Sequence, residues 1–184
     1  ILRTSEKDGF NHIYALGFDG DINAITSGNW DVIEFLGIDE DKRRVYYASA
    51  EKGAIHKGIY AINLDGSNKQ SISSETGSND AGFSTGMKFF VKSYSNANTP
   101  TVYSLCDQTG KELFVLEDNK LLKDKLSKYK LATQEFITVK GHEDDLNAYI
   151  IKPVDFDPAK KYPLYIHIYG GPGSNMVSDG FSGA

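Results

Sequence analysis

The sequence has 184 residues, enough to bury a core as one domain or as two small ones. Its 25 acidic and 20 basic residues give a net charge of −5, which disfavours a nucleic-acid surface. Cys106 is the single cysteine and cannot form an intramolecular disulfide, and no apolar run approaches the roughly 18 residues that span a bilayer. We expect no cofactor, metal ion, nucleic acid or membrane span in this chain. A single cysteine does not indicate the cellular compartment of the protein.

Three segments repeat one hairpin pattern, in a composition rich in aromatic residues and glycine that favours β structure. Each has an apolar strand with a central tyrosine, a tight turn and a second alternating strand. The tyrosines, Tyr14, Tyr60 and Tyr103, are 46 and then 43 residues apart. Glycine in each turn supplies the positive φ that tight hairpins need. The turns are Asp19-Gly20, Asp65-Gly66 and Thr109-Gly110.

A further strand pair precedes the second and third hairpins, within residues 30–51 and 79–95. Four strands in a unit of about 45 residues have the size of a β-propeller blade. Residues 1–118 therefore predict half a blade followed by two whole blades. Ile1 is not an initiator methionine, and we expect the other blades to precede it. A small twisted β-sandwich is the alternative that hairpin repeats leave open.

The pattern changes at Glu117. Leu122, Leu126 and Tyr129 follow at helical spacing, lysines lie toward the end of the segment, and Asp118 can cap its start. We predict a short amphipathic linker helix within residues 119–130.

Residues 131–184 have a different character. A hairpin is predicted at residues 134–153, with its bend between Gly141 and Asp145. The run at 163–168 is apolar at nearly every position, which predicts a strand buried on both faces, as in the middle of an α/β sheet. The glycine-rich turn that follows begins at Tyr169 and lies at the carboxyl end of that strand, where such sheets bind ligands.

The sequence resembles the dipeptidyl peptidase IV subfamily of the prolyl oligopeptidase-type serine peptidases. The resemblance covers essentially the whole chain and is carried by RTSEKDGFNHIYAL, TSGNWDV, SYSNANTPTVYSL, LEDNKLL and YIIKPVDFDPAKKYPLYIHIYGGPGS. It implies a propeller that caps an α/β-hydrolase domain. The expected fold is mainly β: about two and a half blades (1–118), a linker helix (119–130) and the truncated start of the hydrolase domain (131–184).

By the same resemblance, Tyr169 is the phenol that donates a hydrogen bond to the oxyanion of the tetrahedral intermediate. Gly170, Gly171 and Gly173 are expected to serve backbone geometry. The nucleophile and the triad Asp and His lie downstream in the family, and the residues that hold the substrate amine lie upstream. We therefore expect this chain alone to be inactive.

Other polar motifs are weaker candidates. Ser84 satisfies G-x-S-x-G, but the following MKFFVKSYS is β-rich, whereas a nucleophile elbow requires a helix there. The sequence GFSGA at the C-terminus lies too close to Tyr169 to be an elbow. The HEDD segment at 142–145 is expected to be a solvated bend. His167 is expected to pack in a strand.

Three functions are compatible with these features. The first is part of an exopeptidase that releases N-terminal dipeptides with Pro or Ala in the second position. The second is a related prolyl tripeptidyl or acylaminoacyl peptidase, and the third is a non-catalytic propeller module. For the first, the resemblance implies oligopeptide substrates, a periplasmic or extracellular location, and a homodimer.

Overall fold

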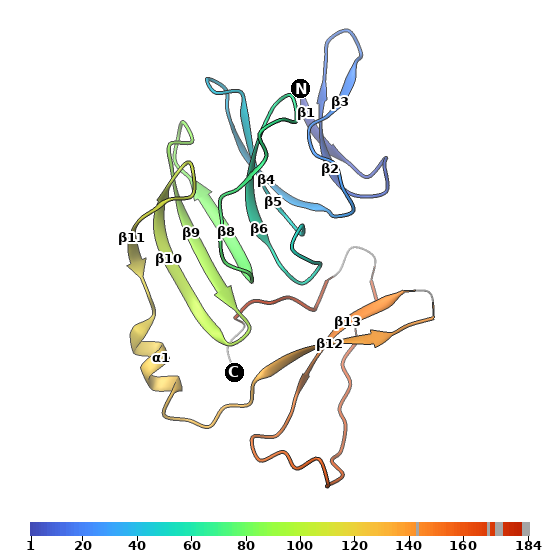
Figure 1. The fold of residues 1–184 in the computed structure, drawn as a ribbon, viewed down its shortest axis with the longest axis vertical. Coiled ribbons are helices and arrows are strands. Elements are labelled where there is room, and N and C mark those ends of the chain that lie inside the picture. Colours follow the sequence, from blue (N-terminus) through green and yellow to red (C-terminus); the bar gives the residue numbers. More distant parts are fainter. Residues whose placement is uncertain (143, 169, 172–174, 182–184) are drawn as a thin grey trace.

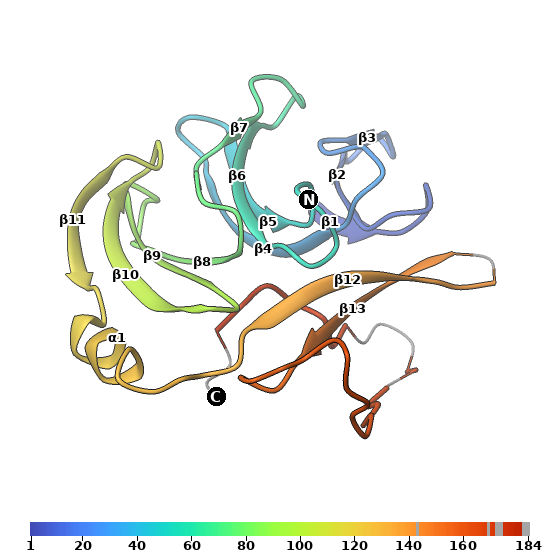
Figure 2. The same cartoon turned by 60° about the horizontal axis from the view of Figure 1, so that its bottom comes forward.

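A computed structural model of the protein describes residues 1–142, 144–168, 170–171 and 175–181. In these residues, strands up to Glu117 form three antiparallel sheets, followed by one short helix and a separate two-stranded hairpin. Figure 1 shows the three sheets side by side, and Figure 2 shows that they follow an arc with the hairpin below them.

The second and third sheets each have four strands in consecutive order. Both confirm the strand pairs and hairpins predicted from the repeats. The second sheet contains β4 (Val32–Asp39), β5 (Arg44–Ser49), β6 (Gly58–Asn63) and β7 (Gln70–Ser71). The third contains β8 (Ser78–Phe83), β9 (Phe89–Asn96), β10 (Thr99–Asp107) and β11 (Glu112–Glu117).

The first sheet has three strands, one more than the predicted half blade. They are β1 (Leu2–Ser5), β2 (His12–Leu16) and β3 (Ile22–Ala24). β1 pairs with β2 from Leu2 opposite Ala15 to Ser5 opposite His12. The sequence signal missed β1 because this strand contains one apolar residue, too few for an alternation, whereas its pairing is made by the backbone.

The repeat is confirmed by equivalent positions in the three sheets. Tyr14, Tyr60 and Tyr103 all lie in the strand that begins the hairpin, β2, β6 and β10. A buried hydroxyl that follows the last strand of the sheet also recurs in the first and second sheets. The backbone N–H of Ile13 donates to Thr26 Oγ1 at 2.9 Å, and that of Ile59 donates to Ser73 Oγ at 2.9 Å.

The hydrophobic core lies between neighbouring sheets, and the second sheet is buried on both faces. Along β5, Val45 and Tyr47 pack toward the first sheet, whereas Tyr46 packs toward the third. This alternation follows from the two-residue period of a strand. Cys106 is a buried free thiol in the second of these clusters, and burial raises its pKa, as expected for an unreactive structural cysteine.

The helix predicted within residues 119–130 is present as α1 (Lys120–Leu126), but its cap differs from the prediction. Asn119 is the N-cap and has a left-handed backbone, with a φ of 53°. The Asp118 carboxylate instead accepts the Lys120 N–H at 2.8 Å. The predicted apolar stripe is not buried, because α1 contacts little of the described chain beyond β10.

The predicted hairpin is present as β12 (Gln134–Lys140) and β13 (Asp145–Ile151), with full antiparallel pairing. The strand predicted at 163–168 is not formed. Leu164, Tyr165, Ile166 and Ile168 are 69–87% exposed, and the segment has no regular structure. An inner strand takes its hydrogen bonds from neighbours on both sides and its burial from layers on both faces. In the described residues, residues 163–168 have neither a neighbouring strand paired with them nor layers that cover both faces.

Candidate functional site

Tyr169, the candidate oxyanion donor, lies outside the described residues, and so does Gly173. The structure describes Gly170 and Gly171 directly after it, and residues 175–181 farther along the chain. Among the residues that follow the glycine-rich loop, the structure therefore shows the contacts of residues 175–181, the C-terminal flank of the loop. We call residues 175–181 the docking segment.

The docking segment contacts the second and third sheets through Asp179. The Asp179 N–H donates to the Ile55 carbonyl at 2.7 Å. Its carboxylate Oδ1 accepts the Ala97 N–H at 2.8 Å, and Oδ2 lies 3.4 Å from Nδ1 of His56. One aspartate thus contacts two loops that are distant in sequence.

These two loops occupy equivalent places in adjacent sheets. Residues 50–57 join β5 to β6, and residues 97–98 join β9 to β10. Figure 1 shows the red C-terminal trace running beneath the lower ends of the second and third sheets, where these loops lie. The docking segment therefore spans the seam between two sheets.

Two further hydrogen bonds hold the docking segment at its ends. Asn175 Nδ2 donates to the Ala54 carbonyl at 3.1 Å, and the Phe181 N–H donates to Ser95 Oγ at 3.2 Å. The seam below it is itself fixed by Lys57, whose ammonium binds Glu34 at 3.0 Å and also Asp80. Burial alone would lower the pKa of Lys57, but these two hydrogen bonds outweigh it and raise the pKa above its ordinary value.

His56 adds a polar atom to this contact. Its side chain is 18% exposed and that of Asp179 is 14% exposed. Within the described part of the chain, the buried Nδ1 of His56 has no hydrogen-bond partner. The Asp179 carboxylate faces this nitrogen at 3.4 Å.

The other candidates are placed away from this contact. Ser84 lies in the turn between β8 and β9, where its N–H donates to the Phe89 carbonyl at 2.8 Å and its Oγ accepts the Phe89 N–H at 3.2 Å. The next element after Ser84 is the strand β9 and not a helix, as the sequence predicted. His142 is exposed at the bend of the β12–β13 hairpin, and the described residues hold no cluster of three potential metal ligands.

The two remaining histidines differ: His12 is structural, and His167 was predicted incorrectly. His12 is buried, with Nε2 2.9 Å from the Gly28 carbonyl and Nδ1 3.1 Å from Thr26 Oγ1. The carbonyl requires a proton on Nε2, so His12 is held in one tautomer. His167 is exposed, not packed in a strand, because the strand predicted around it is not formed.

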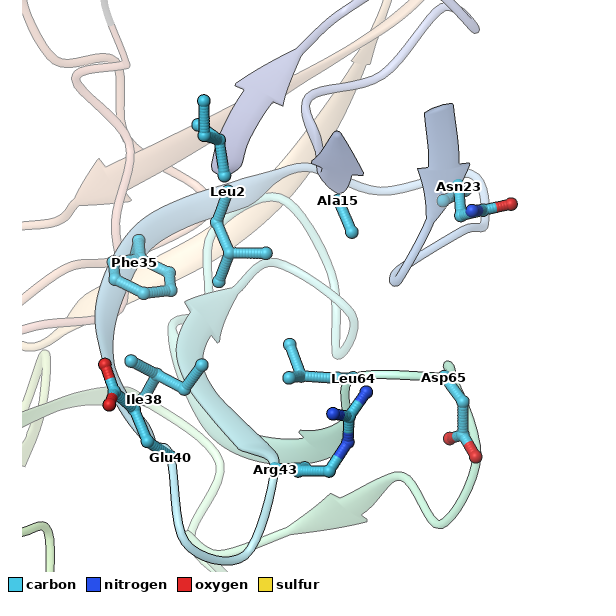
Figure 3. A pocket seen from close by; sticks show the side chains of 11 residues that line it. Leu2, Ala15, Asn23, Phe35, Ile38, Glu40, Arg43, Leu64 and Asp65 are labelled. Carbon is cyan, nitrogen blue, oxygen red and sulfur yellow. The ribbon is translucent and has the colours of Figure 1, made fainter. Parts of the chain in front are cut away.

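A pocket of about 850 Å³ lies between the first and second sheets (Figure 3). Leu2, Phe35 and Leu64 provide apolar surface, and Arg43 and Asp65 contribute charge. Hydrogen bonds from Ser67 hold the pKa of Asp65 below its ordinary value. The described lining contains no serine, cysteine or histidine, so it does not provide the hydroxyl or thiol nucleophile and imidazole base of a Ser-His or Cys-His pair.

Comparison with known proteins decides the family. Residues 1–101 match the family model for the dipeptidyl peptidase IV (DPP IV) N-terminal region. The chain belongs to the dipeptidyl peptidase IV family. It is similar to dipeptidyl peptidase 4 of Trichophyton equinum, with 31% identity over 97% of this chain. It is also similar to a probable dipeptidyl-aminopeptidase B of Coccidioides posadasii, with 31% identity over 98% of this chain.

Solved structures of this family confirm the mainly β propeller fold. The crystal structure of Porphyromonas gingivalis dipeptidyl peptidase 4 matches with a TM-score of 0.92 and 42% identity, over 98% of this chain and 26% of that one. A putative dipeptidyl aminopeptidase IV from Bacteroides ovatus matches with a TM-score of 0.83 and 26% identity, over 98% of this chain and 28% of that one. The chain spans 24% of the Trichophyton and 20% of the Coccidioides relative.

Sequence reasoning missed the Asp179 contact. Asp179 and Ala97 are 82 residues apart, and the sequence SDG around Asp179 indicates only a turn.

In the part of the chain that the structure describes, no helix is long and apolar enough to cross a membrane.

Proposed function

We propose that this chain is part of a serine-type dipeptidyl peptidase that releases N-terminal dipeptides with Pro or Ala in the second position. The observation that carries the proposal is the continuous match to dipeptidyl peptidase 4 of Porphyromonas gingivalis, at 42% identity over 98% of the chain. Coverage of 98% extends this match beyond residues 1–101, which the family model matches. Relatives named dipeptidyl peptidases indicate a peptidase parent.

In this proposal the chain contributes three parts to the enzyme. Residues 1–118 are the last propeller blades, residues 119–130 the linker and residues 131–184 the start of the α/β-hydrolase domain. The substrate is an oligopeptide that binds between the two domains. The parent enzyme is proposed to be periplasmic or extracellular and to form a homodimer.

Tyr169 is proposed to stabilise the oxyanion. A phenol O–H held in place before the reaction stabilises negative charge as it develops on the carbonyl oxygen, at no cost in reorganisation. The second donor of such an oxyanion hole is the backbone N–H that follows the nucleophile. By the family resemblance, the nucleophile, the triad Asp and the triad His come from other parts of the parent protein.

A serine-directed fluorophosphonate probe tests the serine type and the inactivity of this chain. We expect the full-length protein to be labelled at a serine other than Ser84, and the purified 184-residue chain to remain unlabelled. We also expect Ser84→Ala in the full-length protein to keep its rate of dipeptide release within about twofold, because Ser84 Oγ is already bound to the Phe89 backbone. Labelling of Ser84, or peptide release by the isolated chain, would contradict the proposal.

A further inference from the structure

We propose that Asp179 is a positioning residue, which clamps the C-terminal flank of the Tyr169 loop to the seam between two propeller sheets. The inference rests on the proposed function for its catalytic consequence. Its structural basis is independent of that function, because every contact involved lies in described residues.

The contacts of Asp179 explain why one side chain can act as a clamp. Its carboxylate accepts the Ala97 N–H in the loop of the third sheet through Oδ1, and Oδ2 lies 3.4 Å from His56 Nδ1 in the loop of the second. Its backbone N–H separately donates to the Ile55 carbonyl. A bond between a carboxylate and a backbone N–H is charge-assisted and stronger than a bond between neutral groups. The Asp179 side chain is only 14% exposed, and the lower dielectric of a buried site strengthens the bond further.

Neighbouring contacts restrain the docking segment without replacing Asp179. Asn175 bonds to the second sheet alone, and Phe181 bonds to the third sheet alone. Gly180 lies beside Ser78, where an added Cβ would make an ordinary van der Waals contact at 3.4 Å from the Ser78 Cβ. Among these residues, Asp179 alone contacts loops of both sheets through its side chain. Removing the carboxylate should therefore release the segment from Ala97 and from His56, although the Asp179 N–H stays bound to the Ile55 carbonyl.

The effect on catalysis follows from chain connectivity. Tyr169 precedes Asp179 by ten residues. Because Gly170 and Gly171 do not themselves restrict the backbone, the position of Tyr169 depends on where the C-terminal flank of the loop is held. Misplacing a catalytic group by about 1 Å can cost about 10²-fold in rate. An oxyanion exists in the transition state and not in bound substrate, so a misplaced donor lowers kcat and leaves KM largely unchanged.

The test uses variants of the full-length enzyme with a dipeptidyl chromogenic substrate. We expect Asp179→Ala to lower kcat about 10–100-fold and to change KM less than about threefold. Asp179→Asn keeps an amide oxygen that can accept the Ala97 N–H, so it should recover kcat to within about fivefold of wild type. The matched control is Asp155→Asn at an exposed aspartate, and it should have no effect on kcat.

Hydrogen exchange provides the structural readout. We expect the Ala97 and Phe181 amides to exchange at least about tenfold faster in Asp179→Ala, with exchange in β5 and β6 unchanged. Unchanged exchange at Ala97 overturns the clamp, whatever happens to the rate. Unchanged kcat in Asp179→Ala overturns the positioning role. If the wild-type enzyme releases no dipeptides, the proposed function fails, and the clamp is decided by exchange alone.

Discussion

Replacing Tyr169 with phenylalanine in the full-length enzyme should lower kcat by about 10²–10³-fold, with KM changed by less than about threefold. The substitution removes one O–H group and keeps the ring, so binding of the ground state is largely preserved. The lost donor would act on the oxyanion, whose charge develops fully only in the transition state. Steady-state kinetics on a dipeptidyl substrate measure both constants.

A matched control is Tyr165→Phe, four residues upstream in the same apolar run. Tyr165 is 87% exposed, and its phenol has no proposed role, so kcat should stay within about twofold. A transition-state analogue that mimics the tetrahedral intermediate should also lose affinity for Tyr169→Phe by about the same factor as kcat/KM. If Tyr169→Phe keeps full kcat, the phenol is not an oxyanion donor.

Replacing Gly110 with alanine should destabilise the third sheet by about 3 kcal/mol, through backbone strain together with overpacking. Gly110 has a φ of +88°, and a Cβ added there would lie 2.3 Å from the Ile72 carbonyl oxygen. The β10–β11 turn therefore rests directly on the backbone at the end of the second sheet. Hydrogen exchange of slowly exchanging amides in β9 and β10 measures the local free energy of opening.

The repeats supply controls for this prediction. Gly66 occupies the equivalent turn with a φ of +81°, but its added Cβ would lie 3.3 Å from the Ile25 carbonyl oxygen. Gly20 has a φ of +94°, with nothing within 4 Å. Alanine at Gly20 should cost about 1 kcal/mol, from backbone strain alone. Equal costs at Gly20 and Gly110 would show that close approach between the sheets contributes nothing.

Much of the fold could be predicted because the signals are local and repeated. The central tyrosines and the glycine turns recur at nearly constant spacing, so each hairpin supports the others. Alternation located β4, β5, β8 and β9 without structural knowledge. β1 could not be found in this way, since its pairing with β2 uses backbone groups that every sequence has.

The site was less predictable because it depends on contacts between distant segments. Asp179 bonds to loops 82 and 124 residues away, and nothing in its sequence neighbourhood indicates them. The apolar run at 163–168 illustrates the opposite error. Its composition fits a buried strand, but composition alone supplies neither the partner strands nor the covering layers, and His167 is consequently exposed.

Product analysis by mass spectrometry tests the central claim most directly. The full-length protein is incubated with three peptides: one with proline second, one with proline third, and an N-acetylated form of the first. The proposed function predicts release of the N-terminal dipeptide from the first peptide only. Release of a tripeptide from the second, release of an acylated residue from the third, or no cleavage of any peptide would contradict it.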